Sequence, residues 1–105
     1  MIIRKYFQPS FTICVHPVLE DKYISGSILS SGTWELVIGL KIGKALDFFP
    51  NAFFLDLGAN LGVHGLLAAA KGHRTWAVEP LRKNLIKVIN VLLRRSTRLC
   101  LLQTT

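Results

Sequence analysis

A glycine turn between two short apolar runs constrains the fold of this chain more than any other feature. Residues 53–57 are apolar except for one acid and lead into the turn at Gly58. A helix pattern follows Gly62, and a second apolar run over residues 75–78 ends at Glu79. A helix that joins two strands places them side by side and parallel through a right-handed crossover. The sequence therefore predicts an α/β fold with a parallel sheet and flanking helices.

Composition and capping residues predict the elements before this unit. Residues 11–15 are β-rich, whereas the Ser- and Gly-rich stretch 25–32 is typical of a loop. Thr33 is expected to cap a helix that holds Glu35 in its first turn and ends at Pro50.

The later elements follow from similar signals. A small-residue helix over residues 61–71 is expected to end at Gly72, and Pro80 suits the start of another helix. The tail over residues 98–102 fits either a third strand or a frayed end. The continuous apolar run 53–57 predicts a strand buried on both faces, as in parallel sheets. Both tryptophans, Trp34 and Trp76, are expected in the core.

The glycine turn carries the chemistry of a ligand site. Gly58 and Gly62 permit positive φ and remove the Cβ that would meet a ligand. The helix after them presents free N–H groups to an anion. Asn60 stands where a dinucleotide fingerprint has its middle glycine, and the Asp56 carboxylate repels a diphosphate. Asp56 attracts an ammonium group, so an amino-acid-like cationic ligand is favoured over NAD.

Glu79 is the second half of the signal. It lies about twenty residues beyond the turn, at the spacing from which an acid accepts hydrogen bonds from ribose hydroxyls. The alternative is structural, namely a tight turn beside a helix-capping Glu79. His64, in the first turn of the helix, is either a ring that approaches a ligand or a capping or surface side chain.

These motifs resemble those of FkbM-type methyltransferases. The segments Asp56-Leu57-Gly58-Ala59-Asn60-Leu61-Gly62 and Val78-Glu79-Pro80 are similar to the family pattern Asp-x-Gly-Ala-Asn-x-Gly followed by a strand ending in Glu-Pro. The segment 31–35 looks like the family's pre-core Gly-x-x-Glu. By this resemblance, Gly58 and Gly62 line the methionine part of S-adenosylmethionine, Asp56 and Asn60 orient it, Glu79 holds the ribose, and Glu35 approaches the cofactor.

The resemblance also implies a fold and an activity. It implies a Rossmann-like parallel sheet of the class I methyltransferase type, here truncated, with an N-terminal strand and loop segment over residues 1–32 and the first half of the domain over 33–105. The reaction is methyl transfer to an oxygen of a small-molecule or sugar-type acceptor, whose identity and catalytic groups the sequence leaves unknown. The truncated chain can be inactive, so its status as an enzyme is open. The alternative is a non-catalytic α/β fragment that acts by pairing with another chain, with self-association through an open sheet edge as one option.

Charge and cysteine content limit which other classes of function fit this chain. The 105 residues carry a net charge of +7, but their basic residues follow an apolar helix pattern without interleaved aromatics, which argues against a nucleic-acid surface. Cys14 and Cys100 fit no metal or redox spacing, and two buried thiols in a reducing compartment are the simplest interpretation. No metal site is predicted from His16, His64 or His73. No apolar run is long enough to span a membrane, and a cytoplasmic location is the default expectation.

Overall fold

The computed structural model describes residues 2–3, 6–94 and 99–102. Its main sheet has three parallel strands in the order β3-β4-β5, with bounds Phe54–Leu57, Thr75–Val78 and Leu99–Leu102. The predicted α/β class with parallel strands is therefore correct, and the tail forms the third strand. The short strands β1 (Ile2–Ile3) and β2 (Phe11–Thr12) pair antiparallel in a separate sheet.

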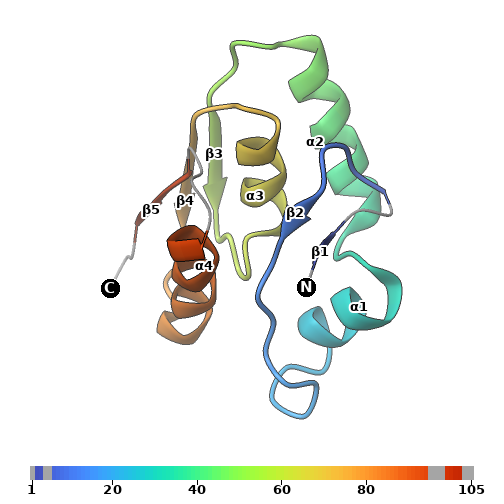
Figure 1. The fold of residues 1–105 in the computed structure, drawn as a ribbon, viewed down its shortest axis with the longest axis vertical. Coiled ribbons are helices and arrows are strands. Elements are labelled where there is room, and N and C mark those ends of the chain that lie inside the picture. The colour runs from blue at the N-terminus through green and yellow to red at the C-terminus, as the bar shows by residue number, and fades with distance from the viewer. Residues whose placement is uncertain (1, 4–5, 95–98, 103–105) are drawn as a thin grey trace.

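The helix α3 (Val63–Ala70) lies at the centre of the molecule, between the main sheet on one side and α2 (Leu36–Phe48) and β2 on the other (Figure 1). Its leucines and alanines have high helix propensity, and almost all residues of the helix are buried, as expected for a helix surrounded by protein. It ends where Gly72 adopts a positive φ of 90°.

A single core joins the N-terminal segment to the sheet and its helices. Ile3, Phe11 and Ile13 lie in the same buried cluster as Leu67 and Val88. Val88 belongs to α4 (Arg82–Arg94), whose start follows Pro80 as the sequence predicts. This shared core holds α3 and α4 against the sheet.

A buried polar link also joins the N-terminal segment to α4. The Nε2 atom of His16 lies 2.8 Å from the Asn84 side-chain oxygen on α4, and both residues are buried. The backbone N–H of His16 donates to the Ser25 hydroxyl at 3.0 Å. Because His16 and Asn84 lie 68 residues apart in the sequence, the sequence pattern does not indicate this hydrogen bond.

Two of the sequence predictions for the N-terminal third are wrong. The stretch predicted as a loop contains helix α1 (Ile24–Ser31), because Asp21 accepts hydrogen bonds from the backbone N–H groups of Ile24 and Ser25 and so caps its first turn. Thr33 does not cap the next helix. The Thr33 hydroxyl donates to the Trp34 carbonyl at 3.5 Å, and α2 begins only after Glu35.

The described residues cover the main sheet on one face only, which contradicts the prediction of a strand buried on both faces. Thr75 and Ala77 are fully buried on the side of α3, whereas Leu55 and Leu57 are 50% and 72% exposed on the other side. Trp76 also lies on the open face, 47% exposed, so its predicted place in the core is wrong. Trp34 packs partly buried against the core. Of the two thiols, Cys14 is half-buried and Cys100 is exposed, so the expectation of two buried thiols fails for Cys100.

Candidate functional site

The turn after β3 is tied to the end of β4. The backbone N–H groups of Gly58 and Ala59 both donate to the Val78 carbonyl, at 2.8 and 2.9 Å. Asn60 has a positive φ of 53°, a conformation that asparagine tolerates better than most residues. The carboxyl ends of the two parallel strands therefore meet at this turn, which is where open α/β sheets bind ligands.

The two glycines of the turn serve different purposes. Both have positive φ, 79° at Gly58 and 89° at Gly62. A Cβ on Gly62 would lie 3.3 Å from Leu66 and 3.4 Å from Val88, so packing also requires a glycine there. A Cβ on Gly58 would meet no described atom within 4 Å, and Gly58 is exposed. The backbone at Gly58 is thus the part of the turn that a ligand can approach.

The carboxylate of Glu79 turns inward, beneath the turn. Glu79 is only 3% exposed. One of its oxygens accepts the backbone N–H of Asn60 at 2.9 Å, and the other accepts the N–H of Leu81 at 2.9 Å, just before α4. The structural role that the sequence left open for Glu79 is therefore present, since this acid joins the glycine turn to the start of the next helix.

Asp56 is the second acid of the site, near the end of β3. It accepts a hydrogen bond from the backbone N–H of Gly65 in the first turn of α3, where a carboxylate is also favoured by the helix dipole. Its Oδ2 atom is buried without a hydrogen-bond partner among the described residues. Burial raises the pKa of Asp56, an effect that nearby His64 and the Gly65 N–H oppose.

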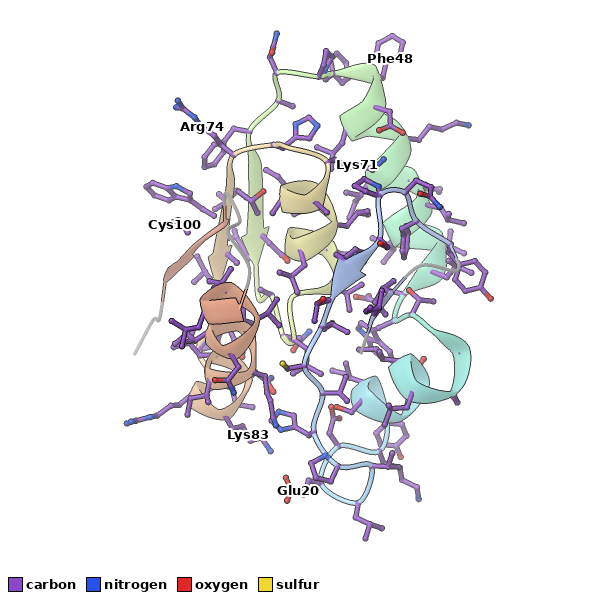
Figure 2. The ribbon with its side chains drawn as sticks, in the orientation of Figure 1. Glu20, Phe48, Lys71, Arg74, Lys83 and Cys100 are labelled. Atoms are coloured by element: carbon purple, nitrogen blue, oxygen red, sulfur yellow. The ribbon has the colours of Figure 1, made fainter. Side chains whose placement is uncertain are left out.

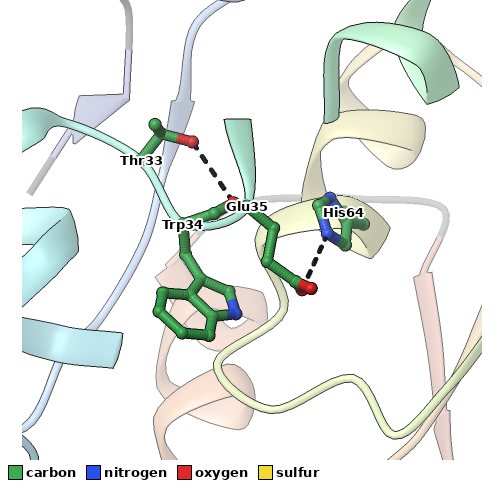
Figure 3. Close-up of polar contacts among 4 residues, drawn as sticks. All are labelled: Thr33, Trp34, Glu35 and His64. Atoms are coloured by element: carbon green, nitrogen blue, oxygen red, sulfur yellow. Dashed lines mark hydrogen bonds and ion pairs between the residues drawn. The ribbon is translucent and has the colours of Figure 1, made fainter. Parts of the chain in front are cut away.

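Glu35 reaches the site through His64. Its Oε1 atom lies 3.4 Å from the His64 Nε2 atom, and Figure 3 shows the two side chains pointing toward each other from the start of α2 and the first turn of α3. The prediction that Glu35 lies in the first helical turn is wrong. It precedes α2 in a left-handed conformation with a φ of 54°, an unusual state for a glutamate. The Nδ1 atom of His64 is buried without a partner in the described part of the chain.

The charged side chains around the turn lie close enough to influence one another electrostatically. The carboxyl group of Asp56 interacts with the charges of Glu35 and Glu79 and with His64. All six residues predicted for the site, which are Glu35, Asp56, Gly58, Asn60, Gly62 and Glu79, thus lie on the turn or are linked to it by these contacts. The result is an acidic edge on a chain whose net charge is +7. Such an edge attracts a cationic group.

Other features of the described residues lie away from this site. A surface hollow of about 330 Å³ lies at the opposite edge of the sheet, between residues 50–53 and 72–74. Within residues 2–3, 6–94 and 99–102, no group of three or more His, Cys, Asp or Glu side chains is arranged to hold a metal ion. The helices in those same ranges are too short or too polar to cross a bilayer.

Comparison with known proteins gives no match: no protein-family model fits the chain, and no curated protein or solved structure is significantly similar to it.

Proposed function

We propose that the chain binds S-adenosylmethionine at the turn after β3, as part of a Rossmann-like methyltransferase domain of the FkbM type. The observation that carries the proposal is the convergence at one sheet edge of an exposed, positive-φ Gly58 and the carboxylates of Glu35, Asp56 and Glu79. The sequence motifs that resemble the family thus coincide with an acidic, ligand-accessible turn.

The charge of this edge matches the charge of the cofactor. S-Adenosylmethionine carries a positive sulfonium and a positive ammonium group, and both are attracted by Asp56 and Glu35. Each oxygen of Glu79 accepts one backbone N–H and the side chain is only 3% exposed, so Glu79 contributes to the proposed site by holding the turn in shape and by its negative charge. A pyrophosphate would face the same carboxylates, so NAD is a poorer fit.

The reaction that the proposal implies is in-line methyl transfer from the sulfonium to an oxygen of a small-molecule or sugar-type acceptor. Such a displacement depends largely on alignment of the acceptor with the methyl group. The described residues supply the cofactor half of that alignment. We assign no catalytic residue to this chain.

The proposal is tested by calorimetric titration with S-adenosylmethionine and S-adenosylhomocysteine. The wild-type chain is expected to bind both, and Asp56→Asn is expected to weaken S-adenosylmethionine binding by at least tenfold, about 1.4 kcal/mol. Asp47→Asn is the matched control, because it makes the same chemical change at an exposed aspartate that pairs with Lys71, away from the turn. Equal binding by wild type and Asp56→Asn, or tighter binding of NADH than of either ligand, would contradict the proposal.

Asp56→Asn also suits the test because we expect it to fold. The raised pKa of Asp56 means that, above the ordinary value of 3.8, the native state holds its proton more tightly than the unfolded state. As pH rises from the ordinary pKa of 3.8 through the higher native pKa of Asp56, its ionisation therefore lowers the stability of the fold, and this loss persists at neutral pH. Asparagine keeps an oxygen for the Gly65 N–H and removes the charge. Urea unfolding at pH 7 should show the variant more stable than wild type, and a clear loss of stability would refute this reasoning.

A further inference from the structure

One face of the main sheet is apolar, and no helix in the described part of the chain covers it. The side chains on it are Phe53, which directly precedes β3, with Leu55, Leu57, Trp76, Val78 and Cys100. The rings of Phe53 and Trp76 pack edge to face, with centroids 5.8 Å apart. The helices α2, α3 and α4 all lie on the other side of the sheet (Figure 1), and Figure 2 shows Cys100 and Arg74 on the side away from α3. We call this surface the open sheet face.

A parallel sheet with one bare face is rare, because parallel sheets are almost always covered on both sides. An aromatic side chain presents about 150–250 Å², so the half-exposed Phe53 and Trp76 contribute about 100 Å² each. With the two exposed leucines and their neighbours, the open sheet face offers on the order of 500 Å² of apolar surface. That is near the upper end of the largest patch on a typical monomer, and such patches mark interaction sites.

We propose that the open sheet face is a self-association surface, on which a second copy of this chain packs face to face through a two-fold axis. Two such faces would bury about 1,000 Å² together, which reaches the lower bound for a specific interface. Sheets pack in this way in sandwiches, with their inner side chains interdigitated.

The chemistry of the face favours a second copy over a charged or polar partner. None of the strand residues on it carries a charge, since Asp56, the only acid in the three strands, points toward α3. Arg74 lies just before β4, at the rim. A face without charges offers no electrostatic recognition of an acidic or basic partner. An isologous dimer needs only self-complementarity, and two copies of an uncharged apolar face are chemically complementary to each other.

The proposal does not depend on the cofactor site. The acidic turn lies at the carboxyl ends of β3 and β4, whereas the open sheet face is the broad side of the same strands. Binding of S-adenosylmethionine and dimerisation can therefore succeed or fail independently.

The first test is sedimentation of the full chain between about 1 and about 300 μM, with two leucine variants. Leu55→Glu places a charge in the proposed interface, and each dimer would bury two of them, so the dissociation constant should rise by about 100-fold or more. Leu40→Glu is the matched control, because Leu40 is 46% exposed on α2 and Leu55 is 50% exposed on β3. Since both leucines are half-exposed in the single chain, circular dichroism should show both variants folded.

The expected result is a concentration-dependent species of twice the 11.7 kDa chain mass, lost in Leu55→Glu and kept in Leu40→Glu. A wild-type chain that stays monomeric throughout would overturn the proposal and leave the face to another occupant. A dimer that survives Leu55→Glu, or one that Leu40→Glu disrupts equally, would place the interface elsewhere and also overturn it.

Cys100 gives a second measurement that needs no change on the face. This exposed thiol sits beside Trp76 in the strand register, whereas Cys14 is half-buried and can be replaced by serine. In Cys14→Ser, alkylation of Cys100 should slow as the chain concentration rises through the dissociation constant. An alkylation rate that stays constant while the dimer forms would overturn the proposed face.

Discussion

Replacement of Glu79 by glutamine tests the most specific contact of the site. The buried carboxylate accepts two backbone N–H groups, those of Asn60 and Leu81, each at 2.9 Å. Glutamine keeps one acceptor oxygen but turns an NH₂ group toward the other backbone donor. A hydrogen bond to a charged acceptor contributes about 1.5–3 kcal/mol, and a buried donor left unpaired costs about 1–3 kcal/mol. We therefore expect Glu79→Gln to lower the free energy of unfolding by about 2–3 kcal/mol.

For a chain of this size, that loss corresponds to a fall in Tm of about 10–20 °C. The assay is thermal and urea unfolding followed by far-UV circular dichroism, with Glu20→Gln as the matched control because Glu20 is exposed. An unfolding midpoint for Glu79→Gln within about 2 °C of wild type would refute the reasoning. The Glu79 side chain would then not bridge the turn and α4, and would be free to point outward. The same contacts make Glu79→Ala a poor probe of cofactor binding, since it should disturb the turn itself.

Two further predictions concern the helices that flank the site. Partial burial disfavours ionisation of Asp21, but hydrogen bonds from the Ser25 hydroxyl and from two backbone N–H groups outweigh it and hold the pKa of Asp21 below its ordinary value. This acid therefore stabilises the fold above about pH 3.8, and the stabilisation is lost as pH falls through its native pKa. Urea unfolding should show Asp21→Ala about 1 kcal/mol less stable at pH 7, with a gap that closes below that window; a gap independent of pH would contradict the capping role. In α2, Gly43→Ala should raise the free energy of unfolding by about 0.5–1 kcal/mol, because the added Cβ meets only ordinary van der Waals contacts. Gly39→Ala should lower the free energy of unfolding, because its Cβ would lie 2.8 Å from the buried Phe7 ring. Thermal melting of the two variants compares them directly, and equal shifts would refute the packing argument.

Much of the fold could be predicted because strong local signals agreed with the tertiary structure. The alanine-rich α3, its stop at Gly72 and the parallel pairing of β3 with β4 all follow from periodicity and turn chemistry. Helix α1 was missed because serine and glycine have weak helix propensity. Its stability comes from the Asp21 cap and from tertiary contacts, since Ile28 is fully buried and the Ser25 hydroxyl accepts the backbone N–H of His16.

The exposure of the sheet could not be predicted from the apolar run alone. Leu55, Leu57 and Trp76 have the composition of a strand covered on both sides, and periodicity reports what a strand can bury rather than what covers it. The sequence correctly indicated strands, but it could not show that the described helices all pack on one face.

The candidate site likewise has some features that the sequence predicts and others that it does not. The turn at Gly58 and its link to Glu79 follow from motif spacing within one strand-helix-strand unit. The contact between Glu35 and His64 spans 29 residues and depends on a left-handed Glu35, for which the sequence carries no pattern. Long-range side-chain pairs of this kind are set by the packing of α2 on α3.

The most direct test of the proposed cofactor site is titration of the ¹⁵N-labelled chain with S-adenosylhomocysteine, followed by backbone amide chemical shifts. We expect saturable shifts centred on Gly58, Asn60 and Gly62, with little change around the hollow at residues 50–53 and 72–74. An absence of shifts at about 1 mM ligand, or shifts centred on that hollow instead, would contradict the assignment of the glycine turn as the cofactor site.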